Sequence, residues 1–218
     1  MFSKPTTVAG VLALVLAPSI ATAQQFTADL IRTKPTGAAN SKVYVNGDKI
    51  RFETVGAPNG NAVIMDRAQG TSMMILPDNK SYIVDKLGST PSLTPFFRVA
   101  DPDNACEALE NAAGKPGTCS KVGDDTVGGR TAVKYSSAAQ NGDTTYAWVD
   151  RSLHFVVKWE GQKTAAEFHN IQEGPQAAAL FLPPPGYDKT DLAQAKADSK
   201  NNKTKTKTRT QVRPVPQE

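Results

Sequence analysis

Hydrophobic and polar residues alternate with a period of two along most of this chain. Ile50 and Phe52 alternate with charged residues, and the stretch 153–160 repeats the pattern with Val156 as its one exception. This period is typical of strands that bury one face. Turn-forming pairs such as Asn46-Gly47 separate the alternating segments, and they favour hairpins because both residues tolerate positive φ. The pattern therefore predicts a long antiparallel meander with local connections.

About eleven strands are expected, and one stretch without alternation interrupts them. Between residues 88 and 117 the pattern stops, and the segment from Cys106 to Ala113 is rich in helix formers. Asp103 or Asn104 is available to cap this helix, and Gly114 is expected to end it. The strands are expected at 26–34, 41–46, 48–56, 61–67, 71–76, 80–86, 119–123, 130–137, 143–150, 153–160 and 163–171.

The apolar residues of these strands are expected to share one face of a curved sheet. That face would carry Val43, Val45, Ile50, Phe52, Tyr146, Trp148, Leu153, Phe155, Val157 and Trp159. One or two short helices offer little cover for it, so a cleft suited to an acyl chain would remain. Alternatively, the sheet closes on itself and these residues form an ordinary core. Under the first hypothesis, the residues predicted to line the cavity are Phe52, Phe96, Phe97, Trp148, Phe155 and Trp159.

The first 23 residues have the features of a secretory signal peptide. Lys4 supplies a positive charge, Val8 to Ala17 form a short apolar run, and Ala21-Thr22-Ala23 is a small-x-small cleavage site. The run is shorter than the ~20 residues that span a bilayer, so a signal peptide is favoured over a membrane anchor. We expect cleavage after Ala23 and a mature protein in the periplasm or outside the cell.

The two cysteines fit an oxidising compartment. Cys106 and Cys119 are both in the mature part of the chain. Such a pair favours a disulfide over two free thiols. A structural metal site would normally need two further Cys or His ligands, and the two histidines, His154 and His169, stand in separate positions.

Charge divides the mature chain into two parts. Residues 24–188 carry 16 basic and 18 acidic side chains, a net charge of −2, whereas residues 189–218 carry 8 and 3, a net charge of +5. We expect residues 24–188 to form the folded domain and residues 189–218 a disordered tail, since the tail has little to bury. The tail would either bind an anionic membrane surface or envelope polymer, or serve only as a solvated segment.

No catalytic arrangement is visible in the sequence. There is no nucleophile elbow, glycine-rich phosphate loop or cluster of metal ligands. Asp124-Asp125 precedes the Gly128-Gly129 turn and is expected to be solvated. The sequence therefore predicts a protein that is not an enzyme and needs no cofactor or metal. A monomer that does not bind nucleic acid is expected.

Several stretches resemble the LolA/LolB-like superfamily of periplasmic lipoprotein carriers, and most closely the DUF4412 group within that fold. The resemblance spans about residues 26–188. It rests on five stretches and on the order in which they follow one another along the chain. These are Ser41–Phe52, Leu76–Tyr82, Trp148–Gly161, Phe168–Gln176 and Leu180–Tyr187. The carriers' functional arginine precedes a proline, whereas Gly47-Asp48 stands at the corresponding place here, so no functional residue is transferred.

The resemblance implies a mainly β fold, an incomplete antiparallel barrel with helices as a lid over an apolar cavity. It also implies a carrier whose partners are lipids or the acyl chains of lipoproteins. The alternative function is a non-enzymatic envelope binding or structural module with a filled core, which would act through its surface and its basic tail.

Overall fold

The computed structural model describes residues 24–56, 61–88, 95–114, 118–138 and 143–191. In these ranges twelve strands form one open sheet in the order β12-β6-β5-β4-β3-β2-β1-β11-β10-β9-β8-β7. The strands are β1 (Gln25–Lys34), β2 (Gly37–Asn46), β3 (Lys49–Thr54), β4 (Ala62–Asp66), β5 (Thr71–Leu76), β6 (Ser81–Lys86), β7 (Cys119–Val127), β8 (Arg130–Ala138), β9 (Thr144–Asp150), β10 (Phe155–Glu160), β11 (Ala165–Glu173) and β12 (Asp188–Lys189). The predicted mainly β fold, an incomplete antiparallel barrel with a lid helix, is confirmed.

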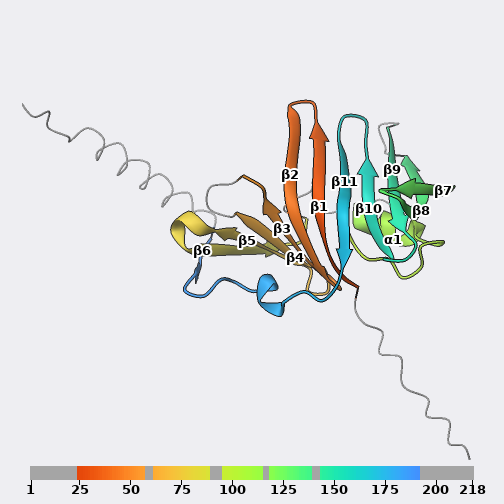
Figure 1. Cartoon of the computed structure of the whole chain (residues 1–218). Coiled ribbons are helices and arrows are strands. Elements are labelled where there is room, and N and C mark those ends of the chain that lie inside the picture. The colour runs from red at the N-terminus through yellow and green to blue at the C-terminus, as the bar shows by residue number, and fades with distance from the viewer. Residues whose placement is uncertain (1–23, 57–60, 89–94, 115–117, 139–142, 192–218) are drawn as a thin grey trace, which may run out of the picture.

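Two meanders make up the sheet. Strands β1 to β6 pair with their neighbours along the chain, and so do β7 to β11. The two meanders meet where β1 pairs with β11, with Leu30 opposite Phe168 and Arg32 opposite Ala166. Figure 1 shows β11 lying between β1 and β10. One pairing between distant segments therefore joins the halves of the molecule.

Most strand boundaries lie within two residues of the prediction, and three features depart further. β2 begins at Gly37 and not at residue 41, because Ala38 and Ala39 pair with β1 although they lack strand-forming side chains. β7 extends to Val127 and includes Asp124 and Asp125, which were expected beyond the end of this strand. β12 was not predicted; it pairs in parallel with β6 over two residues. In each case hydrogen bonds to a neighbouring strand decide the structure where side-chain pattern is weak.

The predicted helix is present as α1 (Cys106–Ala113), and Gly114 ends it with φ of 65°, a conformation that glycine adopts without strain. The predicted cap is wrong. Ala105 occupies the N-cap position without a side-chain hydrogen bond. The Asp101 carboxylate instead accepts hydrogen bonds from Asp103 N at 2.8 Å and Asn104 Nδ2 at 2.6 Å. These groups are therefore used in the turn before the helix.

A cluster of aromatic rings fills the junction of the two meanders. The rings of Phe96 and Phe168 are stacked with centroids 4.5 Å apart, and Phe26 meets Phe155 edge-on at 5.3 Å. All four side chains have at most 1% of their surface exposed. This part of the interior is filled, so burial of these rings stabilises the sheet where its distant strands meet.

Two smaller apolar clusters cover other parts of the sheet. One lies between α1 and β8–β10 and contains Phe97, Tyr135 and Val149. The other lies under the short 3-10 helix η3 (Ala178–Phe181), where Phe181 packs against Ile64 and Ile75. The chain after β11 therefore covers the first meander, and α1 covers the second.

A bulge in β10 changes which residues share a face. Lys158 lies opposite Trp148 and Trp159 lies opposite Ala147, with a register shift between Val156 and Lys158. Residues directly opposite each other point to the same side of a sheet. Trp159 therefore projects from the side opposite to Trp148, and the expectation that both share one face is wrong.

The Cys106–Cys119 disulfide is confirmed, with Cα atoms 5.3 Å apart. It links the start of α1 to the start of β7. The predicted signal peptide, residues 1–23, and the predicted tail beyond Asp191 lie outside the described residues. Within the described ranges, the helices are too short or too polar to cross a membrane.

We predict that replacing both cysteines by serine lowers the free energy of unfolding by about 2–4 kcal/mol, because the bridge closes a short loop that the unfolded chain would otherwise open. Urea denaturation of the oxidised wild type and the double variant measures this difference. The wild type with reductant is the control and should match the variant. Equal stability of oxidised and reduced wild type would contradict the prediction.

Candidate functional site

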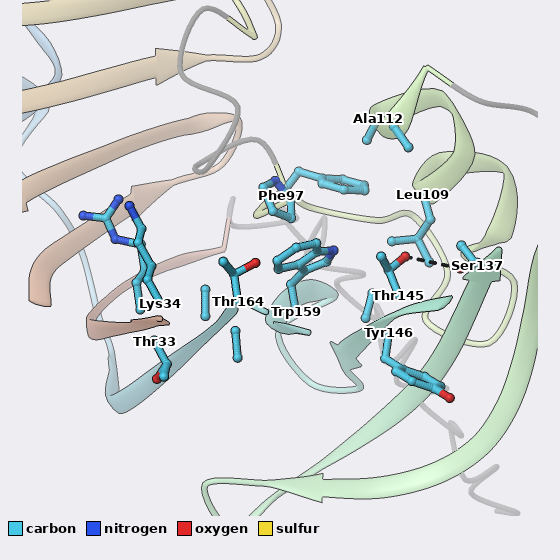
Figure 2. A pocket seen from close by; sticks show the side chains of 16 residues that line it. Thr33, Lys34, Phe97, Leu109, Ala112, Ser137, Thr145, Tyr146, Trp159 and Thr164 are labelled. Atoms are coloured by element: carbon cyan, nitrogen blue, oxygen red, sulfur yellow. Dashed lines mark hydrogen bonds between the residues drawn. The ribbon is translucent and has the colours of Figure 1, made fainter. Parts of the chain in front are cut away.

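A cavity of about 400 Å³ lies between the sheet and α1. Its lining is predominantly apolar and comes from α1, from the segment before it, and from the ends of β1 and β8–β11. Figure 2 shows Phe97 and Trp159 in the middle of the site, with Leu109 and Ala112 toward one end and Lys34 toward the other. The lining residues are Arg32, Thr33, Lys34, Pro95, Phe97, Leu109, Ala112, Ala113, Ser137, Thr145, Tyr146, Ala147, Trp159, Thr164, Ala165 and Ala166.

The strand register builds the floor of this cavity. Arg32 on β1 lies opposite Ala166 on β11, which lies opposite Trp159 on β10. Trp159 in turn lies opposite Ala147 on β9, which lies opposite Tyr135 on β8. Large side chains therefore alternate with alanines along one row across the sheet. The alanines leave open the space that larger residues would fill.

Two of the six residues predicted to line a cavity do line this one, namely Phe97 and Trp159. Phe52, Phe96 and Phe155 lie instead in the filled aromatic core, with 3%, 0% and 0% of their surface exposed. The structure therefore separates the predicted set into a core group and a cavity group. Lipid binding by Phe97 and Trp159 stays a prediction.

Trp148, the sixth predicted residue, is held on the other side of the sheet by charged groups. The ammonium groups of Lys134 and Lys158 each lie 4.8 Å from the centre of a Trp148 ring. Its Nε1 donates a hydrogen bond to Asp125 at 2.8 Å, and this bond is the main cause that lowers the pKa of the Asp125 carboxyl. Cation–π contact and this hydrogen bond fix the indole in place.

Arg32 is a site residue that the sequence analysis missed. The inward positions of β1 are Phe26, Ala28, Leu30 and Arg32. The sequence could therefore have indicated this residue, because Arg32 is a charged residue at a strand position where the alternation expects an apolar one. Lys34 continues the same phase at the strand's end and also lines the cavity.

The Arg32 guanidinium is incompletely satisfied. Its Nη2 donates to Ser41 Oγ at 3.2 Å, but its Nε is buried without a hydrogen-bond partner in the part of the chain that the structure describes. Burial lowers the pKa of Arg32 from its ordinary value. Among the ion pairs between described residues, none includes Arg32. A positive charge thus lies at the cavity, and no carboxylate of the described residues forms an ion pair with it.

Ion pairs anchor the segment that leads into α1. The Asp103 carboxylate accepts hydrogen bonds from Arg151 Nη1 at 2.7 Å and Nη2 at 3.0 Å, and from Lys121 Nζ at 2.6 Å. The bonds from Arg151 and then Lys121 lower the pKa of Asp103 to about 2. These ion pairs connect the segment just before α1, the lid helix, to β7 and to the turn between β9 and β10.

The histidines lie outside the cavity lining. His154 Nδ1 lies 3.0 Å from the carbonyl oxygen of Ala100, and His169 Nε2 lies 3.4 Å from Glu167 Oε1 on the same strand. Over the described ranges, His, Cys, Asp and Glu side chains form no group of three that could hold a metal ion.

Comparison with known proteins shows similarity of fold. Neither known protein families nor curated protein sequences match this chain. A solved structure of an uncharacterized conserved protein from Thermus thermophilus is 9% identical, with a TM-score of 0.50 over 77% of this chain and 90% of that one. At this identity the likeness is one of fold alone, and membership of the LolA/LolB-like superfamily stays a prediction. Membership of the DUF4412 group stays a prediction.

Two further solved structures are more distant. MucB in its complex with MucA from Pseudomonas aeruginosa is 14% identical, with a TM-score of 0.46 over 74% of this chain and 56% of that one. A putative outer membrane lipoprotein-sorting protein domain from Vibrio parahaemolyticus is 9% identical, with a TM-score of 0.21 over 74% of this chain and 90% of that one.

The Asp103 contact predicts a pH dependence of stability. A carboxyl with a depressed pKa stabilises the folded state above its ordinary pKa, and this contribution is lost as the pH falls through the folded-state value. We therefore expect Asp103→Asn to be less stable than the wild type at pH 6, with the difference closing between about pH 4 and pH 2. Urea denaturation at a series of pH values measures it. A difference independent of pH would contradict the assigned ion pairs.

The position of Trp159 depends on Gly161. A Cβ atom at residue 161 would lie 2.8 Å from Trp159 Cη2, closer than Cβ atoms normally approach, and 3.2 Å from Cζ2, which is a tight contact. We predict that Gly161→Ala displaces the Trp159 ring and shifts its fluorescence emission. The measurement is made in a Trp148→Phe background, so that Trp159 is the one emitting tryptophan. An unchanged emission maximum would show that the ring does not pack against residue 161.

Proposed function

We propose that this protein binds a lipid, or an acyl chain of a lipoprotein, in the cavity between the sheet and α1, and carries it in the periplasm or outside the cell. The observation that carries the proposal is the cavity itself. Its volume of about 400 Å³ falls within the range of ~300–1,000 Å³ that is usual for small-molecule sites. Its lining combines aromatic, aliphatic and alanine side chains with a few polar groups.

The lid supports this proposal because it holds the cavity open. Leu109 and Ala112 of α1 line the cavity, and the Cys106–Cys119 bridge fixes the start of the same helix to β7. Asp103 anchors the segment before the helix. A tethered lid lets an apolar space persist, and such a space takes up apolar ligands more readily than water.

The resemblance of the sequence to the LolA/LolB-like superfamily favours the same ligand class. The alternative, a binding or structural module that acts through its surface, is favoured by the filled aromatic core of Phe26, Phe96, Phe155 and Phe168. The two functions differ in one measurable respect. A carrier binds an apolar molecule in its folded state, whereas a module with a filled interior does not.

A cavity-filling substitution tests the proposal. We expect the wild type to bind the neutral fluorescent probe N-phenyl-1-naphthylamine, and Ala112→Phe to bind it about tenfold more weakly, because the phenyl ring would occupy the apolar space. A tenfold loss of affinity corresponds to about 1.4 kcal/mol. Fluorescence titration of the purified protein measures the affinity.

The matched control is Asn111→Phe, which adds the same ring one residue earlier on α1. Asn111 is exposed and is not among the cavity-lining residues, so this variant should bind within about twofold of the wild type. Thermal unfolding checks that both variants are folded. Equal binding by both variants would show that the probe does not bind in this cavity. If the wild type does not bind the probe, the alternative function, a module that acts through its surface, is favoured.

A further inference from the structure

The charged side chains that line the cavity all carry positive charge. Arg32 and Lys34 are the charged residues among those that line it, and both are cationic. Neutral polar groups contribute the rest of the polar lining, among them Thr33, Thr145 and Thr164. A half-buried cation without an opposite charge is costly unless a ligand or partner supplies one. The lining therefore offers positive charge to whatever enters.

The positions beside Arg32 on the two adjacent strands carry small side chains. Its direct neighbours on the adjacent strands are Ala39 on β2 and Ala166 on β11, so short side chains flank the guanidinium on both sides. The guanidinium donates one hydrogen bond to Ser41, and its buried Nε finds no partner among the described residues. A guanidinium offers donors in a planar fork that matches the oxygens of a carboxylate or phosphate.

The cationic and apolar parts of the cavity lie at different ends. Figure 2 shows Lys34 on one side of Trp159 and Phe97, and Leu109 and Ala112 of α1 on the other. If the charged group of a ligand lay near the end of β1, the rest of the ligand could extend along the aromatic side chains toward α1. This is the arrangement that an amphiphile requires, with its head group at one end and its chain along the apolar wall.

We propose that the ligand of this cavity is a single-chain anionic amphiphile, whose carboxylate or phosphate head group pairs with Arg32 while its acyl chain lies against Phe97, Trp159 and α1. The inference rests on the proposed function and names its ligand class. Lys34 adds positive charge at the end of the same strand. The volume of about 400 Å³ lies near the lower end of the ~300–1,000 Å³ usual for ligand sites, which favours one chain over several.

The experiment compares three probes that share one acyl chain. Palmitate carries a carboxylate, 1-palmitoyl-lysophosphatidylglycerol carries a phosphate, and 1-monopalmitoylglycerol is neutral. Calorimetric titration below the micellar concentration measures each affinity for the purified wild type, for Arg32→Gln and for Arg98→Gln. Arg98 is exposed and is not among the cavity-lining residues, so its variant removes an equal charge from elsewhere.

We expect at least one anionic probe to bind the wild type about tenfold more tightly than the neutral probe. Arg32→Gln should abolish this preference and leave the neutral affinity within about twofold, which also shows that the variant is folded. Arg98→Gln should behave as the wild type. The better of the two anionic probes tells whether a fatty acid or a phospholipid head group is preferred.

Two outcomes have separate meanings. If all three probes bind equally to the wild type, or if Arg32→Gln keeps the preference for the anion, the head-group assignment is overturned while the acyl-binding function stands. If none of the three probes binds the wild type, both the assignment and the proposed function fail.

Discussion

The pairing of β1 with β11 is the contact on which the rest of the structure depends. It joins two meanders, β1 to β6 and β7 to β11, within each of which successive strands along the chain pair with one another. Its cost is the closure of a loop that contains almost the whole domain, and the aromatic cluster of Phe26, Phe155 and Phe168 at this junction offsets that cost by burial. The same pairing sets Arg32 beside Ala166, so it also creates one wall of the cavity.

The cavity exists because the two meanders are not covered to the same extent. The first meander meets the aromatic cluster on one side and the segment around η3 on the other. The second is covered by α1, which has eight residues, and by the short stretch before it. Alanines at 147 and 166 in the floor leave a space that this helix does not fill. Tethers at Cys106 and Asp103 hold the helix above that space.

The bulge in β10 decides which tryptophan reaches the cavity. One extra residue in a strand turns every following side chain to the other face of the sheet. Trp159 therefore lies in the row of Arg32, Ala166 and Ala147, whereas Trp148 lies between two lysines on the opposite side. Strict alternation along the sequence placed both on one face, because a bulge leaves little trace in the hydrophobic pattern.

The sequence by itself determined the mainly β fold, the run of strands interrupted by one helix, the stop at Gly114 and the Cys106–Cys119 bridge, because each depends on local periodicity, turn chemistry or cysteine count. The sequence also contained a sign of the site that the prediction did not use, because Arg32 is a charged residue at a position of β1 where the alternation expects an apolar one. Only the tertiary structure decided that Phe52, Phe96 and Phe155 fill a core while Phe97 and Trp159 border a cavity. That division depends on the register between distant strands, and register is set by the packing of whole faces.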